Sequence, residues 1–443
     1  MSKLEELIEK LCPDGVEYKN IGDIFETITD YTAAGSFADI AKNVKYLKNK
    51  DYAQLIRTTD IKSNFTDESN FIYVNKNAFD YLWRVNINKD SIIMPNVGNC
   101  GEVYYIIPER LPNENNVLGP NAVLLRTEKY NLKFLYYCLG TTRFKQKLTK
   151  ITSTTGQTKF NKTNLKELLL PIPPIEVQNE IVRILDNFTK LEAELEAELE
   201  ARKKQYEYYR NALLNFDSPE TLVAVHTHTH THTHGCFREK IKNVWFGEVA
   251  EIVRGASPRP ISNFITNDEK GINWIKIGDV NPTEKYITST KQKITVEGAK
   301  RSRIVKKGDF ILSNSMSFGR PYILKIDGCI HDGWLSISNF EKAYNTDFLY
   351  YLLSSNYVQK QMRQKASIGT VQNLNVDIVK SIRLPLYPME YQNYVVNILN
   401  KFDKLCNDIS QGLPAEIEAR RKQYEYYRDK LLNFKELKVE NKE

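Results

Sequence analysis

Few residues in this chain are arranged for catalysis. Neither a G-x-x-x-x-G-K-[ST] loop nor a G-x-G-x-x-G loop occurs, and there is no paired-His metalloprotease helix. The Asn/Asp-Pro-Pro-aromatic segment of amino-methyltransferases is also absent, since Asn281-Pro282-Thr283 does not match it. One adjacent pair, His331-Asp332, has the residue types of a general base and its orienting carboxylate. A single pair is weak evidence, so we favour a non-catalytic role for His331.

Basic and polar residues gather in patterns that suit nucleic acid better than catalysis. Lys and Arg are frequent at 143–162 and 291–307, and the net charge is +7. Each neutralised phosphate releases counterions, and Asn, Gln, Arg, Ser and Thr are the residues that reach base edges. A Lys-rich run is more often a solvated face and a Ser/Asn run a turn, so each residue is only a candidate. The candidate DNA contacts are Asn96, Asn99, Lys147, Thr155, Gln157, Lys159, Ser313, Asn314, Ser315, Ser317, Arg320, His331, Thr370, Gln372 and Asn373.

Metal-binding signals are weak. The six cysteines lie far apart without a C-x-x-C pair, so buried free thiols are expected. Residues 226–234 alternate His with Thr, and alternation offers no fixed tetrahedral cage, so a linker at 217–235 is favoured over a metal site. A third hypothesis is that the codons of this tract slip in replication and act as a phase-variation switch. We therefore expect no catalytic residue, no metal and no cofactor of the chain's own.

The chain contains an internal repeat, and the candidate residues lie within it. ARKKQYEYYRNALLNF at 201–216 returns as ARRKQYEYYRDKLLNF at 419–434, and 174–188 matches 388–402. The portions at 15–173 and 236–387 match poorly. The helical segments have stayed alike while the globular parts have diverged. This contrast predicts a shared framework that carries two different recognition domains.

Two long helices are predicted by apolar residues at helical spacing through 176–216 and 389–434. Each helix has an apolar stripe that must be buried, and two similar stripes need similar partners. This favours an antiparallel coiled coil of the two helices over helices that each pack on their own domain. Pro414 predicts a break near 412–414. The first helix repeats a four-residue unit, LEAELEAELEAR, at 191–202, and the second is four residues longer here. Residues expected in helix pairing and partner docking are Leu185, Phe188, Leu195, Leu199, Tyr206, Tyr209, Leu213, Leu399, Phe402, Ile417, Tyr424, Tyr427 and Leu431.

Each globular part is predicted to be an irregular α+β domain, in a pseudo-two-fold repeat separated by the two helices. Strand-like runs include 54–58, 71–74, 91–94, 103–107 and 122–126, and in the second copy 273–277, 310–312, 322–326 and 335–338. Helical runs occur at 132–147 and 347–364. The expected divisions are domain 1 at 1–175, helix 1 at 176–216, the linker at 217–235, domain 2 at 236–388, helix 2 at 389–434 and a tail at 435–443.

Several segments resemble the specificity subunits of type I restriction–modification systems. They are Cys12–Tyr18, Gly308–Pro321, His331–Trp334, Gly369–Pro388 and both Lys-Gln-Tyr-Glu-Tyr-Tyr-Arg helices, and together they span nearly the whole chain. The resemblance implies two target recognition domains, each reading half of a bipartite double-stranded DNA site. It also implies that the helices are spacer regions binding two modification subunits. Copy one departs from the pattern, because Ile92–Gly101 lacks an equivalent of Arg320.

The same resemblance implies a non-catalytic subunit of a type I restriction enzyme and adenine-N6 methyltransferase complex. S-adenosylmethionine, ATP and Mg are expected in the partner subunits, and restriction subunits would add translocation and cleavage. No apolar run approaches the ~20 residues of a membrane span, and Ser2–Leu11 is charged and amphipathic, so we expect a cytoplasmic protein with no membrane partner. Two other classes stay open: a stand-alone DNA-modifying enzyme and a coiled-coil scaffold without a DNA role.

Overall fold

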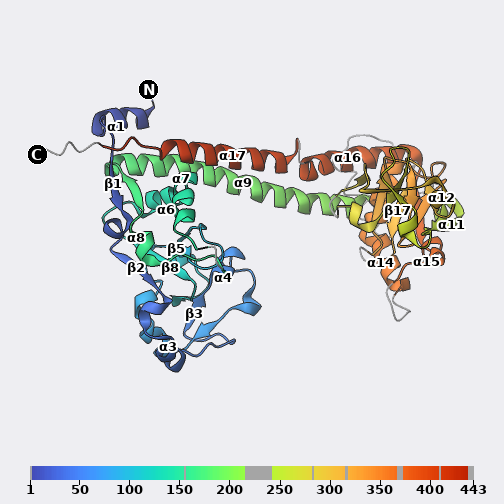
Figure 1. The fold of residues 1–443 in the computed structure, drawn as a ribbon. Coiled ribbons are helices and arrows are strands. Elements are labelled where there is room, and N and C mark those ends of the chain that lie inside the picture. Colours follow the sequence, from blue (N-terminus) through green and yellow to red (C-terminus); the bar gives the residue numbers. More distant parts are fainter. Residues whose placement is uncertain are drawn as a thin grey trace, which may run out of the picture. The chain divides into compact units, whose positions relative to one another are not determined.

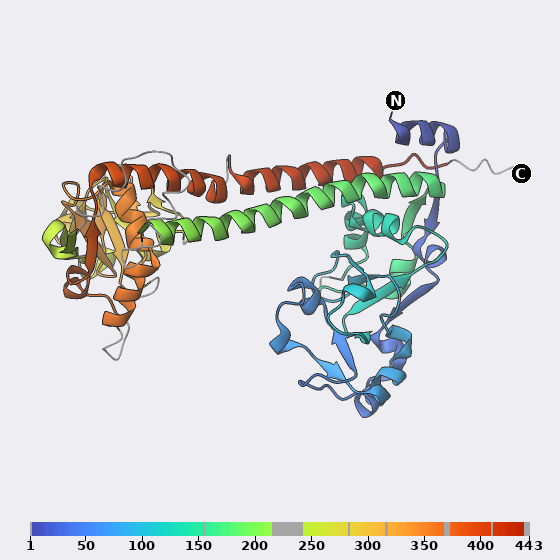
Figure 2. The ribbon, with the colours of Figure 1, turned by 180° about the vertical axis from the view of Figure 1, so that it is seen from behind.

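The computed structural model describes residues 2–153, 156–214, 242–281, 284–314, 318–366, 373–408 and 411–437. The chain divides into two compact units, unit 1 (Met1–Glu194 with Glu418–Glu443) and unit 2 (Leu195–Ile417). Each unit combines one globular domain with parts of the long helices (Figures 1 and 2). The His-Thr tract and Cys236 lie outside the described residues. The other five cysteines are free thiols, and all but Cys100 are buried.

The domain of unit 1 has a four-stranded sheet, in the order β2-β8-β5-β6, with a core on each face. Ile92 and Leu125 face the core shared with helix α6, whereas Ile93 and Leu124 face the core shared with the second sheet, β4-β3-β7. Neighbouring residues of a strand point to opposite faces, so the apolar runs of β5 and β8 are buried on both sides. The elements are α1 (Lys3–Leu11), β1 (Glu17–Asn20), α2 (Ile21–Ile24), β2 (Thr27–Asp30), α3 (Phe37–Asn43), β3 (Ala53–Ile56), α4 (Thr58–Lys62), β4 (Tyr73–Val74), α5 (Lys76–Tyr81), β5 (Ser91–Pro95), β6 (Tyr104–Ile106), β7 (Asn116–Leu118), β8 (Ala122–Arg126), α6 (Leu132–Gly140), α7 (Thr142–Lys150), α8 (Lys162–Lys166) and β9 (Leu169–Ile172).

The domain of unit 2 has the same arrangement, but each of its two sheets has five strands. Its central sheet, β11-β20-β17-β18-β14, has Phe310 and Ile337 in the core with helix α13, and Ile311 and Trp334 in the core facing the sheet β12-β15-β13-β19-β16. The elements are β10 (Lys242–Trp245), α11 (Phe246–Val249), β11 (Glu251–Arg254), β12 (Ile265–Thr266), β13 (Ile272–Ile275), β14 (Tyr286–Ile287), β15 (Gln292–Ile294), α12 (Val296–Lys300), β16 (Arg303–Val305), β17 (Phe310–Ser313), β18 (Pro321–Leu324), β19 (Gly328–Ile330), β20 (Trp334–Ser338), α13 (Thr346–Ser354), α14 (Asn356–Ala366), α15 (Val376–Lys380) and β21 (Arg383–Leu386).

The first long helix is α9, which is continuous over the 40 residues Ile175–Leu214. The second is divided into α16 (Met389–Asn407) and α17 (Leu413–Leu431), so it breaks where Pro414 predicts. Pro is favoured in the first turn of a helix because the amide it lacks would have no partner there. Gly412 lies in the break, where an added Cβ would be 2.6 Å from the Lys404 carbonyl oxygen. A larger residue at 412 would therefore collide with the end of α16.

Both domains are attached to their long helix by the same set of polar contacts, which we call the Asn–Gln clamp. In unit 1 the amide N–H of Asn131 donates to Gln178 Oε1 at 3.0 Å, and Gln178 Nε2 donates to the Pro173 carbonyl at 2.7 Å. In unit 2 the N–H of Asn345 donates to Gln392 Oε1 at 2.8 Å, and Gln392 Nε2 donates to the Tyr387 carbonyl at 2.8 Å. Each Asn also caps its helix, α6 or α13, through its side-chain oxygen. The repeat thus extends from the helices into the domains.

Within each unit the long helices also pack on each other. In unit 1 the rings of Phe188 (α9) and Tyr427 (α17) stack at 5.5 Å, and Arg421 Nε lies 2.9 Å from Glu192 Oε1. Because the residue numbers rise on α9 as they fall on α17, these segments run antiparallel. In unit 2 the ring of Tyr209 stacks on that of Phe402 (α16) at 5.5 Å.

The other residues predicted to pair the helices differ in burial. Leu185, Leu213 and Leu399 belong to the domain cores as well, and are almost fully buried. Half-buried side chains are Leu195, Leu199, Tyr206, Tyr424 and Leu431, and Ile417 is buried. Within each unit the helices therefore pack both on the domain and on each other.

Some predicted elements were wrong in detail. The helical runs at 132–147 and 347–364 are each two helices, because Thr141 and Ser355 adopt extended backbone between them. The Thr141 hydroxyl accepts from the Phe144 amide and so begins α7, which a periodicity pattern does not register. The strand expected at 54–58 ends at Ile56, and α4 begins at Thr58. The Asp60 carboxylate accepts from the Arg57 amide and draws the chain into this short helix.

Near the chain ends, unit 1 joins segments that are far apart in sequence. The amide of Val16 donates to the Lys435 carbonyl at 2.9 Å, and the amide of Leu437 donates to the Val16 carbonyl at 2.9 Å (Figure 1). Gly15 adopts φ +120°, and an added Cβ would lie 2.5 Å from the Lys435 carbonyl oxygen. This position therefore needs glycine, both for its backbone angle and for the close approach.

Candidate DNA-recognition site

The candidate DNA contacts of copy one lie on two loops that touch. Asn96 and Asn99 follow β5, whereas Gln157 and Lys159 follow α7. The loops are joined by the Gly98 amide, which donates to the Thr158 carbonyl at 2.8 Å, and the Phe160 amide, which donates to the Asn96 carbonyl at 3.1 Å. Asn99, Gln157 and Lys159 are exposed, whereas Asn96 Oδ1 is buried without a hydrogen-bond partner among the described residues. Thr155 lies outside the described residues.

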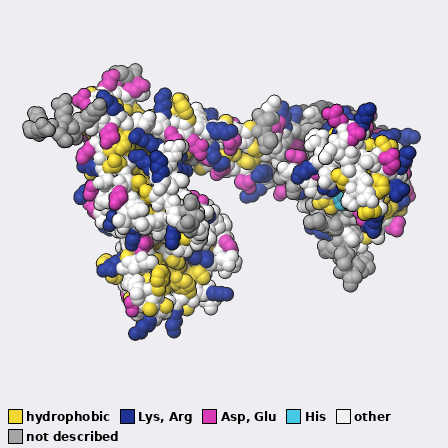
Figure 3. All heavy atoms as spheres, in the orientation of Figure 1, with side chains coloured by type: hydrophobic (Ala, Val, Ile, Leu, Met, Phe, Trp, Pro, Cys, Tyr) yellow, Lys and Arg dark blue, Asp and Glu magenta, His cyan; other side chains and the backbone are white. Residues whose placement is uncertain are grey.

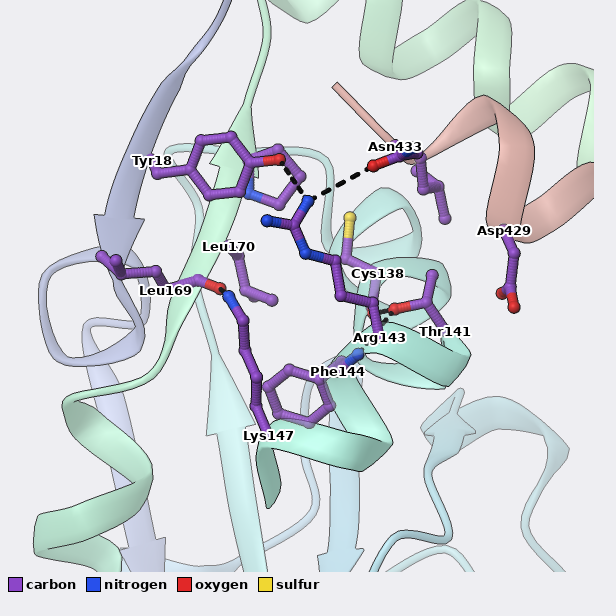
Figure 4. A pocket seen from close by; sticks show the side chains of 12 residues that line it. Tyr18, Cys138, Thr141, Arg143, Phe144, Lys147, Leu169, Leu170, Asp429 and Asn433 are labelled. Carbon is purple, nitrogen blue, oxygen red and sulfur yellow. Dashed lines mark hydrogen bonds between the residues drawn. The ribbon is translucent and has the colours of Figure 1, made fainter. Parts of the chain in front are cut away.

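Lys147 is not part of that loop cluster. Its Nζ lies 3.5 Å from the Leu169 carbonyl and 6.0 Å from the centre of the Tyr18 ring, in a pocket of about 260 Å³ (Figure 4). Arg143 lies beside it and donates to Tyr18 and Asn433 at 3.3 Å. Burial, and then the nearby Arg143, lower the pKa of Lys147. Lys and Arg side chains do gather over α7 (Figure 3), but successive residues of a helix point about 100° apart and so serve different surfaces.

In copy two the candidates gather at the end of β17. Ser313 and Asn314 are buried, and Asn314 Nδ2 donates to the Asp332 carbonyl at 3.1 Å. The Leu374 amide, next to the exposed Asn373, donates to the Asn314 carbonyl at 2.9 Å. Arg320 is exposed at the other end of the same loop. Ser315, Ser317, Thr370 and Gln372 are outside the described residues.

The two loop pairs are anchored in the same way although their sequences differ. The Asn96 carbonyl receives the Phe160 amide in copy one, and the Asn314 carbonyl receives the Leu374 amide in copy two. The rest of each loop differs in sequence. The loop of copy one continues through Val97–Val103 and contains no arginine, whereas the loop of copy two contains Arg320. A fixed base with a variable tip is the arrangement expected when one scaffold presents different reading residues.

His331 is placed as a packing residue. Its Nδ1 accepts from the Gly333 amide at 2.8 Å, and its ring lies between Trp274 and Trp334, with centroids at 6.3 and 6.1 Å. Burial lowers its pKa, so the ring is neutral at pH 7. The Asp332 carboxylate is 3.9 Å from Nδ1 and instead accepts from the Ser257 hydroxyl at 2.7 Å. The pair thus lacks the hydrogen bond that a general base and its orienter share.

Two further findings bear on metals and membranes. Among the described residues, no group of three or more His, Cys, Asp and Glu side chains is arranged to hold a metal ion. In the same part of the chain, no helix is both long and apolar enough to cross a membrane.

One recurring feature was missed at the level of sequence. Phe134-Leu135-Tyr136-Tyr137 and Phe348-Leu349-Tyr350-Tyr351 are identical tetrapeptides inside the diverged domains. Tyr137 donates to Asp186 on α9, and Tyr351 donates to Asn400 on α16 at 2.6 Å. A comparison of the two halves for short identities would have found them, because they lie at the same distance before the matching helices.

Comparison with known proteins agrees with this arrangement. The family model for the type I restriction modification DNA specificity domain matches residues 13–201 and again 238–419. A type I restriction enzyme specificity subunit of Haemophilus influenzae is 33% identical over 319 residues, covering 69% of this chain and 73% of the relative. The EcoR124I/EcoR124II specificity subunit of Escherichia coli is 31% identical over 61% of this chain and 65% of its own length.

Solved structures share the fold. One, from work on the complex assembly and conformational transition of the type I R-M system, has a TM-score of 0.57 at 15% identity and covers 96% of this chain and 99% of its own. The HsdS subunit of Thermoanaerobacter tengcongensis has a TM-score of 0.50 at 13% identity, with 96% and 98% covered. The chain belongs to the type I restriction–modification DNA specificity family, with two specificity domains. It is a DNA sequence-specificity subunit.

Proposed function

We propose that each globular domain reads one half of a bipartite double-stranded DNA target, and that the two long helices form an antiparallel coiled coil that sets the distance between the halves. The observation that carries this proposal is the duplicated anchoring of unlike loops. The Asn–Gln clamp and the Asn96 and Asn314 anchors recur in both copies, whereas the loop tips differ. A rigid element holds base-reading side chains better than a loop alone, because base discrimination depends on fixed hydrogen-bond geometry.

Base reading falls to the exposed polar residues of these loops. In copy one they are Asn99, Gln157 and Lys159, and in copy two Arg320 and Asn373. Asn and Gln suit adenine and Arg suits guanine in the major groove. Ser313 and His331 are packed inside the domain and support the loops without touching DNA. Lys147 lines the pocket beside Tyr18 and is not assigned to base reading.

Docking of partner subunits falls to the long helices. Their repeated motif leaves one large aromatic side chain exposed in each copy, Tyr208 at 60% and Tyr426 at 61%. An exposed aromatic residue at equivalent positions of a repeated helix fits two copies of one partner. The partners proposed are two modification subunits that methylate adenine at N6 with S-adenosylmethionine, joined by restriction subunits that use ATP and Mg. The proposed location is the cytoplasm.

Domain replacement tests this assignment. Residues 236–388 are exchanged for the second domain of the Haemophilus influenzae relative, and the chromosomal methylation motif is read by methylome sequencing. We expect one half of the motif to change while the other half and the gap stay the same, because domain 1 and the helices are untouched. A motif that changes in both halves, or in neither, contradicts the division of reading between the domains.

A further inference from the structure

Each unit contains a cleft with four equivalent parts, which are one long helix, two domain helices and one loop. The unit 1 cleft, of about 630 Å³, is lined by residues of α17, α6 and α7, by the segment 101–104, and also by residues of α4. The unit 2 cleft, of about 980 Å³, is lined by residues of α9, α13 and α14, by the segment 318–321, and also by residues of α16 and the segment 284–286. The segments 101–104 and 318–321 belong to the loops that follow β5 and β17. Each cleft therefore lies beside the loop that carries candidate base-reading residues.

The lining residues of the two clefts correspond through the sequence repeat. The equivalent pairs are Tyr136 and Tyr350, Gly140 and Ser354, Tyr424 and Tyr206, and Arg428 and Arg210. The guanidinium of Arg210 lies 5.6 Å from the centre of the Tyr206 ring, and that of Arg428 lies 5.6 Å from the centre of the Tyr424 ring. Tyr136 and Tyr350 of the diverged domains, together with the Tyr–Arg pairs of the matching long helices, thus give both clefts similar local chemistry, which indicates a ligand common to both.

Both clefts carry an excess of positive charge. The unit 2 cleft is lined by the cations Arg210, Lys285, Arg320, Arg363 and Lys404 and by the acids Glu284, Asp403 and Asp408. The unit 1 cleft is lined by the cations Lys62, Lys145 and Arg428 and by the acid Glu102. The ligand common to both clefts should therefore be an anion.

Part of this charge is paired within the protein. Lys62 pairs with Glu102 at 2.8 Å, Lys285 with Asp347 at 2.8 Å and Arg428 with Asp429 at 2.9 Å. Within the described ranges, no carboxylate lies within 4 Å of the charged groups of Lys145, Arg320 or Arg363. The Nε of Arg210 is buried without a hydrogen-bond partner in the same part of the chain. A buried donor without a partner is costly, so an acceptor from a ligand would be stabilising there.

We propose that each cleft binds a phosphate of the DNA backbone and so fixes the register of its domain on the duplex. This proposal rests on the proposed function, because it assumes that the adjacent loops read DNA. Bases differ between the two half-sites, but phosphates are the same at every position, so a phosphate site is the part of a reading domain that can stay constant. Lys145 on α7 and Arg363 on α14 are exposed cations that line the clefts from equivalent helices. The hydroxyl groups of the lining tyrosines, Tyr136 and Tyr350, can donate hydrogen bonds to phosphate oxygens.

The test uses the full chain assembled with its modification subunits. Lys145→Gln and Arg363→Gln remove one charge from each cleft, and Gln already occupies the position equivalent to Lys145, at Gln359. Lys150→Gln and Lys360→Gln are matched controls, because these lysines are exposed on the same two helices but line neither cleft. Fluorescence anisotropy measures the Kd at several salt concentrations. One probe is a duplex that contains the target motif found by methylome sequencing. The other is an equally long duplex in which both half-sites are scrambled.

We expect each cleft variant to weaken binding to both duplexes by the same factor, about tenfold at 0.1 M salt, and to lower the slope of log K against log salt by about 1. The specificity ratio should stay constant and the controls should match the wild type. Unchanged affinity and slope overturn the proposal. A loss confined to the motif duplex also overturns it, because that result assigns base reading to these residues.

A third outcome concerns protein partners. If native mass spectrometry shows that a cleft variant loses a modification subunit, the cleft is a protein-docking site and the proposal is overturned. Failure of the proposed function would look different, since the wild-type complex itself would then bind both duplexes equally.

Discussion

Deletion of Leu195–Glu198 tests whether α9 sets the distance between the half-sites. Residues 191–202 repeat Leu-Glu-Ala-Glu, so the deletion removes one unit and keeps a leucine at every fourth position. Because α9 is an uninterrupted helix of 40 residues and each residue rises ~1.5 Å, the helix becomes ~6 Å shorter. Base pairs follow each other every ~3.4 Å, so we expect the gap between the half-sites to shorten by at most two base pairs.

The choice of four residues matters for the geometry of the stripe. Four residues turn a helix by ~400°, so the apolar stripe is displaced by only ~40°. A deletion of two residues, Leu195 and Glu196, turns it by ~200° and directs the stripe away from its partner. We therefore expect the four-residue deletion to yield an active complex and the two-residue deletion to prevent assembly.

Methylome sequencing of cells that carry each variant provides the assay. Both half-sites should be unchanged in the four-residue deletion, because no residue of either domain is altered. Leu195→Ala, which keeps the helix length, should leave the gap as it is in the wild type. An unchanged gap in the deletion variant would refute the spacer argument, and a changed half-site would refute the separation of reading from spacing.

Two further predictions concern stability. Gln392→Ala and its counterpart Gln178→Ala should each lower the free energy of unfolding by about 2 kcal/mol, because buried partners of the Asn–Gln clamp lose their hydrogen bonds; urea denaturation measures this, and a loss under about 0.5 kcal/mol would contradict it. Hydrogen bonds from Arg183 and Lys3 lower the pKa of Glu180, whose side chain is 4% exposed, from 4.5 to about 2. A carboxyl whose folded pKa is lowered contributes stability above its unfolded pKa and loses that contribution as the pH falls. Thermal melts should therefore show a melting temperature that falls as the pH is lowered from 4.5 towards 2, and Glu180→Gln should reduce this fall. The same dependence of melting temperature on pH in the variant and the wild type would oppose this role.

Prediction from sequence succeeded where the signal is local. The strand at Ala122–Arg126 and the long helix from about 176 follow from period-2 and period-3.6 patterns, which report contacts between near neighbours. The break before Pro414 follows from the chemistry of one residue. Thr141 and Ser355 were missed because a hydroxyl cap inside an apolar run changes the direction of the chain without changing the pattern.

The candidate site was predicted only in part. Asn96 and Gln157 were selected by residue type, and the structure brings their loops together through backbone hydrogen bonds. Lys147 was grouped with them because it is close in sequence, yet its side chain packs near Tyr18. Spacing along a helix separates faces by about 100° per residue, and residue type alone does not show which face meets the loop.

Local patterns and repeated segments of the sequence establish the duplication, the two long helices, the break in the second and the contrast between alike helices and unlike domains. Which polar residues share a surface depends on the tertiary structure. The anchoring of Phe160 on Asn96 and of Leu374 on Asn314, and the equivalent clefts beside them, depend on strand pairing between distant segments. Such pairing is set by the burial of a whole core and is not encoded in any single stretch of the chain.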